Sequence, residues 1–208
     1  MEAVSAAPDE LARLAAGAIQ KLLRSRPDAV LGLATGSSPL PIYDELVRLH
    51  VEEGLSFARA KAFTLDEYVG LPPQHPQCYL NVIEHEFAER VDFAPGAVRG
   101  PDGLATDILA ASAAYDDAIT EAGGVDLQIL GIGTDGHVGF NEPGSSLASR
   151  TRLKTPTEPT RPDNARRCAG HIHPLPHHRL TPGPRPTAPP PPTRPTAPPR
   201  AQAPRAPP

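Results

Sequence analysis

The amino-acid sequence predicts an α/β fold, namely a Rossmann-like, open and mostly parallel β-sheet with helices on both faces, followed by a Pro-rich disordered tail. Short apolar runs alternate with segments of helical spacing, as in strands that are joined by helical crossovers. Three polar or glycine-rich clusters directly follow apolar runs. Because parallel strands end at the same edge of a sheet, we expect these clusters to meet where ligands of open α/β proteins bind.

Each predicted element has its own signal. Apolar residues recur at helical spacing after the start signal Pro8-Asp9 and again after the turn at 35–39. AVLGLAT and AKAFTL are short apolar runs, which are typical of buried strands. A long helical segment stops at Gly123-Gly124, and the run VDLQILGIG that follows is the most strand-like in the chain. The predicted order is helix 8–25, strand 29–35, helix 40–50, strand 60–65, helix 77–91, helix 104–124 and strand 125–133.

Composition divides the 208 residues into two kinds of polypeptide. Ten prolines precede residue 155 and 18 follow it, and after Asp163 there are seven arginines but neither an acidic residue nor a lysine. Proline removes a backbone donor and fixes φ, so this density permits neither a helix nor a central strand. The sequence therefore predicts an α/β domain at 1–167, incomplete at its C-terminal side, and a Pro/Arg-rich, disordered tail at 168–208.

Charge and composition also argue against several classes of protein. The formal net charge of -4 gives no sign of binding to nucleic acid or to a membrane surface. No apolar stretch approaches the roughly 18 residues of a transmembrane helix. The two cysteines, Cys78 and Cys168, do not form a disulfide framework, so a cytoplasmic location is expected.

Two of the polar clusters, Thr35-Gly36-Ser37-Ser38 and Asp66-Glu67, are open to more than one interpretation. The first could hold a phosphate on its hydroxyls and backbone N–H groups, but Ser37 or Ser38 could equally cap the next helix. Asp66 could be a general base, while Glu67 would point elsewhere because side chains alternate along a strand. A helix cap or a surface turn is the alternative for this pair.

The third cluster, Asp135-Gly136-His137 with Glu142, is more specific. A histidine flanked by carboxylates can be oriented and tuned to move a proton near neutral pH. One histidine and two acids could instead bind a divalent metal. The sequence has no HxH, HExxH or second histidine nearby, so metal binding is the weaker interpretation.

Four segments together resemble the glucosamine-6-phosphate deaminase (glucosamine-6-phosphate isomerase) family: LGLATGSSPLPIYDEL, FTLDEYVGL, HPQCYLNVIEHEF and LGIGTDGHVGFNEPGSSLASRTRLKT. The resemblance extends from about residue 8 to residue 155. It implies an aldose–ketose isomerisation with deamination in amino-sugar catabolism. Glucosamine 6-phosphate and water would give fructose 6-phosphate and ammonia, without a cofactor or a metal.

The resemblance also implies catalytic roles. Asp66 would take the proton from C2 of the sugar. His137 would open the sugar ring, assisted by Asp135 and Glu142.

Two further sets of residues follow from the resemblance. The substrate phosphate would lie on Thr35, Gly36, Ser37 and Ser38, with Arg166 as its charge partner. In regulated members of the family N-acetylglucosamine 6-phosphate binds at a subunit interface, which would imply a homo-oligomer here. The positions that match this allosteric site are Ser145, Arg152, Lys154 and Thr155.

Beyond about residue 155 the sequence diverges from the family or is truncated. The family's phosphate-binding lysine falls near Gln202, within the proline-rich segment. One alternative function is therefore a catalytically impaired remnant that binds sugar phosphate. Another is a 6-phosphogluconolactonase-like hydrolase, although the FNEP continuation of the histidine turn argues against it. The tail motif PPPPTRPTAPPR has the PxxP spacing of ligands for aromatic grooves.

Overall fold

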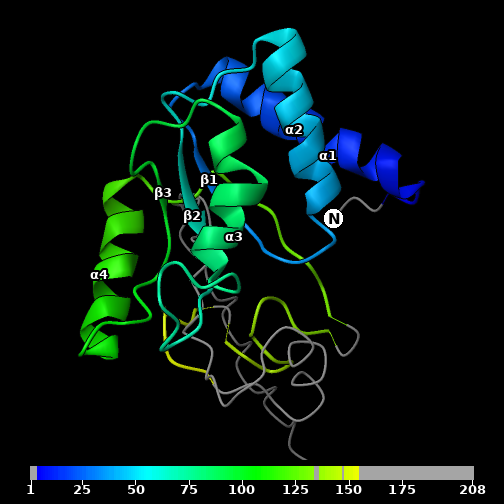
Figure 1. Ribbon diagram of the computed structural model, residues 1–208. Coiled ribbons are helices and arrows are strands. Elements are labelled where there is room, and N and C mark those ends of the chain that lie inside the picture. Colours follow the sequence, from blue (N-terminus) through cyan, green and yellow to red (C-terminus); the bar gives the residue numbers. More distant parts are fainter. Residues whose placement is uncertain (1–3, 134–135, 147, 155–208) are drawn as a thin grey trace, which may run out of the picture.

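A computed structural model describes residues 4–133, 136–146 and 148–154. Four parallel strands form one sheet of order β3-β2-β1-β4 (Figure 1). This arrangement confirms the predicted Rossmann-like parallel sheet. The predicted domain boundary at 167/168 and the predicted disordered tail lie outside the described residues. The strands are β1 (Val30–Leu33), β2 (Lys61–Thr64), β3 (Val98–Arg99) and β4 (Leu127–Gln128).

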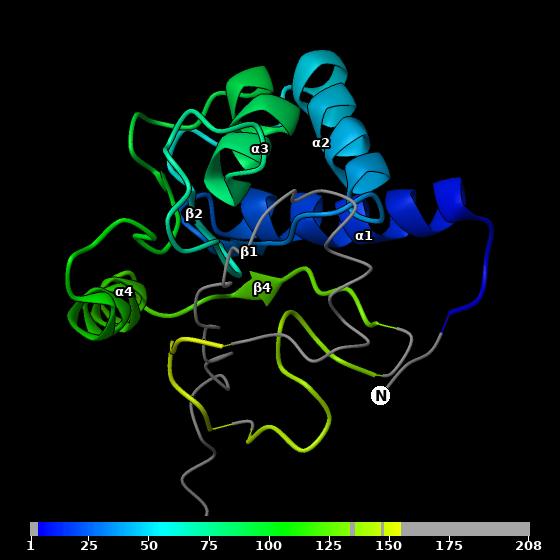
Figure 2. The ribbon, with the colours of Figure 1, turned by 60° about the horizontal axis from the view of Figure 1, so that its bottom comes forward.

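Helices lie on both faces of the sheet, as predicted. The helices α1 to α3 pack on one face and α4 stands on the other (Figure 2). Within the described part of the chain, no helix is both long and apolar enough to cross a membrane. The helices are α1 (Pro8–Ser25), α2 (Leu40–Glu53), α3 (Tyr79–Glu86), the 3₁₀ helix η1 (Ala88–Arg90) and α4 (Ile108–Glu121).

The two faces of the sheet have cores of unequal size. Side chains alternate along a strand, so Leu31 and Leu33 of β1 join the core of α1, α2 and α3. On the opposite face Val30 and Phe63 pack against Tyr115 and Ile119 of α4 in a smaller cluster. Burial of both faces explains why the strand sequences are continuously apolar rather than alternating.

Several boundaries differ from those that the sequence predicts. The predicted helix 77–91 is interrupted at Phe87, where ψ and φ leave the helical region and a short 3₁₀ turn follows. The helix predicted from 104 begins only at Ile108, because the Asp107 carboxylate accepts the N–H of Ala110 and caps it at 2.9 Å. VDLQILGIG pairs with β1 as a strand only at Leu127–Gln128. The edge strand β3 has only two residues, too few for a periodic signal, and was not predicted.

The order of the strands places a reversal of connectivity between β1 and β4. From β1 the chain moves outward through β2 to β3, and then α4 returns it to the other side of β1. Such a switch point leaves room at the carboxyl edge of a sheet, where ligands of open α/β proteins bind. The loops that follow β1, β2 and β4 all lie at this edge, which is the lower end of the sheet in Figure 1.

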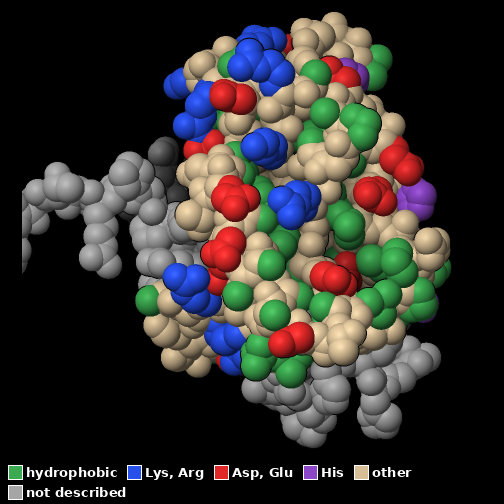
Figure 3. All heavy atoms as spheres, turned by 90° about the vertical axis from the view of Figure 1, so that its left-hand side faces the viewer, with side chains coloured by type: hydrophobic (Ala, Val, Ile, Leu, Met, Phe, Trp, Pro, Cys, Tyr) green, Lys and Arg blue, Asp and Glu red, His purple; other side chains and the backbone are tan. Residues whose placement is uncertain are grey.

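The surface around α4 carries acidic and basic side chains intermixed with hydrophobic ones (Figure 3). Opposite charges that alternate in this way cancel at a distance, unlike the single-signed areas that attract nucleic acid. The exposed face of α4 therefore gives no electrostatic sign of nucleic-acid binding.

Candidate active site

A pocket of about 190 Å³ opens at the carboxyl edge of the sheet. It brings together Thr35 from the loop after β1, Asp66 from the loop after β2 and His137 from the loop after β4. Each of these residues belongs to a different predicted polar cluster. Their convergence agrees with the expectation that the clusters meet at one edge. The remaining lining residues are Ala34, Leu65, Tyr79, Gly131, Ile132, Gly133, Gly139 and Phe140.

Asp66 is a buried carboxyl group in this pocket, with 6% of its surface exposed. Burial, and after it the neighbouring charge of Glu67, together raise the pKa of Asp66 to about 7. A carboxyl group with such a pKa exchanges its proton near neutral pH, so it can both accept and return one. The alternative of a surface turn is therefore wrong for Asp66.

Glu67 is not among the residues that line this pocket, and its carboxylate contacts the start of α3. Its carboxylate accepts the backbone N–H groups of Tyr79 at 2.9 Å and of Leu80 at 3.0 Å, in the first turn of α3. It also accepts the Cys78 thiol at 3.0 Å. These contacts at α3 agree with the prediction that Glu67 does not share the space of Asp66. Its contact with a helix that starts 12 residues later was not predicted, because local sequence gives no signal for it.

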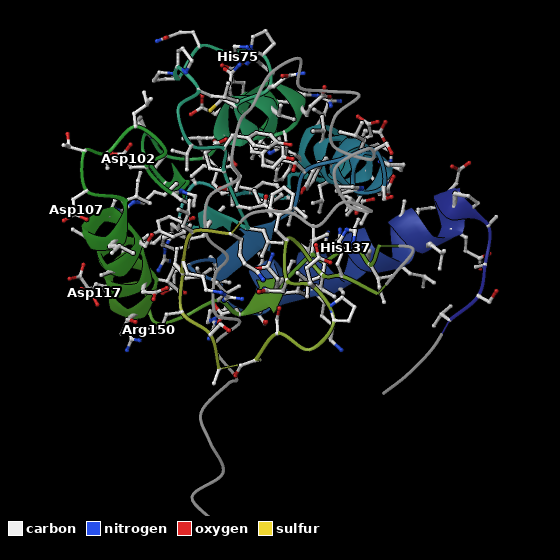
Figure 4. The ribbon with its side chains drawn as sticks, turned by 90° about the horizontal axis from the view of Figure 1, so that it is seen from below. His75, Asp102, Asp107, Asp117, His137 and Arg150 are labelled. Carbon is white, nitrogen blue, oxygen red and sulfur yellow. The ribbon has the colours of Figure 1, made fainter. Side chains whose placement is uncertain are left out.

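His137 lies on a tight hairpin loop whose glycines have positive φ. The Gly133 N–H donates to the His137 carbonyl at 2.8 Å, and Val138 pairs with Asn141 in an antiparallel bridge. The His137 ring packs directly over Gly133, where a Cβ atom would overlap it. Figure 4 looks onto this edge of the sheet and shows His137 on the loop. The glycine density of the motif thus allows the ring to approach the backbone closely.

Phe140 anchors the His137 loop to the loop after β2. Its ring lies 6.2 Å from that of Tyr68 and 6.5 Å from that of Tyr79, measured between centroids. The two tyrosine hydroxyls are hydrogen-bonded to each other at 2.8 Å. All three aromatic residues are buried. This cluster, which the sequence did not identify as part of the site, fixes the distance between the loops that carry His137 and Asp66.

The SRTR segment ties the same loop to α4. The Thr151 hydroxyl donates to the Asp116 carboxylate of α4 at 2.6 Å, and Arg150 lies 3.7 Å from that carboxylate. Figure 4 shows Arg150 at α4. Arg152 donates to the Asn141 side-chain oxygen at 2.6 Å. Two motifs that the sequence shows separately, FNEP and SRTR, therefore hold each other in place.

The turn after β1 is built differently from a capped helix start. Residue Pro39 occupies the N-cap position of α2 and no side chain caps the helix, so the alternative that Ser37 or Ser38 caps α2 is wrong. Gly36 has a φ of 112°, which favours glycine. The buried Tyr43 hydroxyl holds the end of β1 through both the N–H and the carbonyl of Ala34.

The residues that the sequence predicts to bind phosphate do not all line the same pocket. Thr35 lines the 190 Å³ pocket, whereas Ser37 lines a separate pocket of about 660 Å³ between the N-terminal parts of α1 and α2. Arg166 lies outside the described residues. The predicted phosphate site is therefore described only in part.

The other predicted residues have varied outcomes. Asp135 and Thr155 lie outside the described residues. Glu142 is half-buried on the His137 loop but does not line the pocket. Ser145 donates its N–H to the Glu142 carbonyl at 3.0 Å. Among the residues that the structure describes, no group of three or more His, Cys, Asp or Glu side chains is arranged to hold a metal ion.

Comparison with known proteins places this arrangement in a family. Residues 2–168 match the family described as glucosamine-6-phosphate isomerases/6-phosphogluconolactonase. A glucosamine-6-phosphate deaminase of Arthrobacter sp. (strain FB24) is 66% identical over 174 residues, which cover 84% of this chain and 66% of the relative. The corresponding protein of Mycolicibacterium smegmatis is 65% identical over 176 residues, covering 85% and 67%. The chain thus spans about two thirds of the length of these relatives.

Solved structures agree with this placement. A monomeric glucosamine-6-phosphate deaminase superposes with a TM-score of 0.79 at 38% identity, over 86% of this chain and 75% of that one. A 6-phosphogluconolactonase of Thermotoga maritima superposes with a TM-score of 0.62 at 22% identity, over 82% and 72%, which shows a shared fold alone. The sequence matches and the parallel sheet lead to one conclusion: the chain belongs to the glucosamine-6-phosphate isomerase/6-phosphogluconolactonase family.

Proposed function

We propose that this chain converts glucosamine 6-phosphate and water into fructose 6-phosphate and ammonia. The observation that carries the proposal is the pocket that Thr35, Asp66 and His137 share at the carboxyl edge of the sheet. It offers a buried carboxylate, an imidazole and a turn suited to an anion within one small space. The high identity to deaminases of Arthrobacter and Mycolicibacterium supports the deaminase over the lactonase branch of the family.

The first chemical step of the proposed reaction opens the pyranose ring. His137 takes the proton of the C1 hydroxyl and donates a proton to the ring oxygen, which leaves C1 as an aldehyde. Asp135 and Glu142 would orient the imidazole and stabilise its charged form. The fixed hairpin supports this role, because the His137 ring rests on Gly133 and the loop is anchored through Phe140.

The second step moves a proton between adjacent carbon atoms. The Asp66 carboxylate takes the proton from C2, giving an enolate at O1, and the protonated carboxyl returns that proton to C1. The C2 amino group gives up one proton, which is taken up at O1, as C2 becomes an imine. Water then hydrolyses the imine to the ketone with release of ammonia. A pKa of about 7 supports this role, because such a group is basic enough to take the proton and acidic enough to return it.

The substrate phosphate would bind at the turn that follows β1. Thr35 provides a hydroxyl at the mouth of the pocket, and Gly36 lets the backbone come close to an anion. The N-terminus of α2 begins four residues later and adds a favourable dipole. Ser37, Ser38 and Arg166 complete the proposed phosphate site.

The proposal also includes regulation and assembly. Ser145, Arg152, Lys154 and Thr155 would bind N-acetylglucosamine 6-phosphate at the interface of a homo-oligomer, and the enzyme would act in the cytoplasm. Arg152 donates a hydrogen bond to the side chain of Asn141, in the His137 loop, at 2.6 Å. An effector that contacts Arg152 would therefore act on the loop that carries His137. Activation by this sugar phosphate, together with sedimentation velocity, tests both ideas.

The proposed function is tested by measuring ammonia release from glucosamine 6-phosphate by the full chain and by Asp66→Asn. We expect the substitution to lower kcat by at least about 100-fold, the typical contribution of a positioned base. Asp92→Asn is the matched control. Asp92 is a carboxylate that accepts the Phe57 N–H at 2.6 Å and lies outside the pocket, so this variant should keep its activity.

Other outcomes would replace the proposal with one of its alternatives. A folded chain that binds glucosamine 6-phosphate without releasing ammonia would be a sugar-phosphate-binding remnant. Hydrolysis of 6-phosphogluconolactone in place of ammonia release would assign the chain to the lactonase branch. Equal ammonia release by the parent chain and Asp66→Asn would remove Asp66 from the mechanism.

A further inference from the structure

Glu67 is a buried carboxylate for which the proposed reaction has no use. Only 4% of its surface is exposed, yet it forms four hydrogen bonds. One carboxylate oxygen accepts the N–H groups of Tyr68 and Tyr79, both at 2.9 Å. The other accepts the N–H of Leu80 and the thiol of Cys78, both at 3.0 Å. Such complete satisfaction of a buried carboxylate indicates that its position is specified by the fold.

The partners of Glu67 are all hydrogen-bond donors. A backbone N–H can only donate, so three of the four contacts require an acceptor on Glu67. The fourth partner also stays a donor, because burial and the charge of Glu67 raise the pKa of the Cys78 thiol to about 11. If Glu67 were protonated, the proton on one carboxyl oxygen would face the proton of a donor. Four donors around one carboxylate favour its charged form.

Glu67 also joins two elements that carry the site. It lies directly after Asp66 at the end of β2, and it reaches the first turn of α3. Cys78, the N-cap residue of α3, makes no side-chain capping bond itself, so the distant Glu67 satisfies N–H groups of the helix start. A negative charge at this position is further stabilised by the helix dipole.

We propose that Glu67 is the positioning residue for Asp66, holding the loop after β2 against α3 and keeping a second negative charge beside the Asp66 carboxyl group. The inference rests on the proposed role of Asp66 as the base. Burial is the larger cause of the raised pKa of Asp66, and the charge of Glu67 is the second cause. Glu67 thereby keeps Asp66 basic enough to take a proton from carbon.

Other titratable groups around Asp66 do not supply this negative charge. His137 and Tyr79 share its pocket, and Tyr115 of α4 lies close enough to interact with it electrostatically. Burial raises the pKa of Tyr115 well above its usual value, so the phenol is neutral near pH 7. Within the described residues, Glu67 is the carboxylate whose charge raises the pKa of Asp66.

The proposal is tested by following the titration of the Asp66 carboxyl carbon by NMR in the full chain and in Glu67→Gln. Glutamine keeps the size of the side chain and removes its charge, so we expect Asp66 to titrate at lower pH. The acidic limb of the profile of kcat/KM against pH should move in the same direction. Asp92→Asn removes another carboxylate that accepts a backbone N–H, and it should leave both readouts unchanged.

Two results would overturn the proposal. One is an unchanged Asp66 titration in folded Glu67→Gln, and the other is an equal displacement in Asp92→Asn. The NMR readout needs no turnover, so a chain that releases no ammonia would contradict the proposed function and still test Glu67.

If Glu67→Gln does not fold, Glu67→Asp carries the test. The shorter side chain keeps its charge, so Asp66 should titrate as in the parent chain. Its carboxylate falls short of α3, so the amide hydrogens of Tyr79 and Leu80 should exchange faster. Unchanged exchange at these two amides would contradict the positioning role.

Discussion

At the scale of single residues, the site needs burial around one side chain, Asp66, and free space around another, His137. Asp66 and His137 are 71 residues apart in sequence and meet in one pocket. Burial makes the ionised form of Asp66 unfavourable, and this raises its pKa and makes the carboxylate a stronger base. His137 can reach the pocket because Gly133 leaves room for its ring. The pKa of Asp66 and the placement of the His137 ring thus both depend on their surroundings in the folded chain.

The burial of Asp66 predicts a characteristic dependence of stability on pH. The pKa of Asp66 is raised from 3.8 to about 7, so the folded chain binds the proton more tightly than the unfolded chain. The stability that this supplies is fully present below the unfolded pKa and is lost as the pH rises through about 7. Asp66→Asn cannot ionise and escapes this loss. We expect the variant to gain stability relative to the parent chain between about pH 5 and pH 9, on the order of 2–4 kcal/mol.

Urea unfolding of both chains at the two pH values measures this gain. Asp92→Asn is again the control. Burial raises the pKa of Asp92, but the hydrogen bonds from Phe57 and Ser56 and the nearby His50 together keep it below its usual value, so this carboxylate stays ionised over the range. Because His50 lies 3.7 Å from Asp92 and pairs with it as a charge only when protonated, the control should change between the two pH values by at most about 1 kcal/mol, as for a surface ion pair. A change for Asp66→Asn no larger than that of the control would contradict a raised pKa.

At the scale of elements, contacts with neighbouring elements hold the site loops in addition to the hydrogen bonds within the loops. The His137 loop is attached on two sides. Phe140 packs on Tyr68 and Tyr79 of the loop after β2 and the start of α3, and the Thr151–Asp116 hydrogen bond joins it to α4. Two independent attachments orient a loop better than one. The position of the imidazole therefore depends on Phe140 in the pocket wall and on Thr151 and Asp116 outside it.

Phe140→Ala is expected to separate the loops that carry His137 and Asp66. Removing a buried phenylalanine should lower the free energy of unfolding by about 3 kcal/mol. It should also lower kcat/KM of the folded protein, because the imidazole loses its fixed distance from the carboxylate. Urea unfolding and ammonia release measure the two effects.

Phe93→Ala is the matched control for Phe140→Ala. Phe93 is partly buried and packs against the core, on Phe57 and Phe87 at centroid distances of 5.2 and 5.8 Å, and it does not line the pocket. This variant should lose stability but keep the kcat/KM of its folded fraction. If the two variants lose activity only in proportion to their unfolded fractions, Phe140 has no special role in the site.

At the scale of the whole molecule, the sheet separates two cores that differ in size. The core on the side of α1 to α3 joins residues of three helices and two strands, whereas α4 covers the other face with Tyr115, Ala118 and Ile119. Regions with few buried apolar contacts open at lower free energy than the main core. The site draws residues from both sides, because Asp116 of α4 holds the segment that follows the His137 loop.

We expect the amide hydrogens of α4 to exchange before those of α2 under native conditions. The smaller cluster around α4 should open locally, while α2 should exchange only on global unfolding. Native-state hydrogen exchange in low concentrations of urea measures both. Equal protection of the two helices would show that the two cores unfold as one unit.

Sequence patterns predicted the elements with long apolar repeats and missed those that depend on neighbours. The helix 8–25 was predicted with its observed bounds, because its apolar spacing and its start signal are local. The two-residue strand β3 carries no periodicity of its own and forms because β2 offers it a partner. In the same way Phe140 could be quoted as part of a motif, while its contacts with Tyr68 and Tyr79 could not be deduced from it.

The sequence by itself determined the alternation of strands and helices and the residue types after each strand. Family membership also followed from it, because motifs such as DGHVGFNEP lie within one continuous segment. Only the tertiary structure decided that Thr35, Asp66 and His137 share a pocket, that Ser37 faces another one, and that Glu67 caps a distant helix. The physical reason is that propensity and spacing act along the chain, whereas burial, charge coupling and aromatic packing act across space.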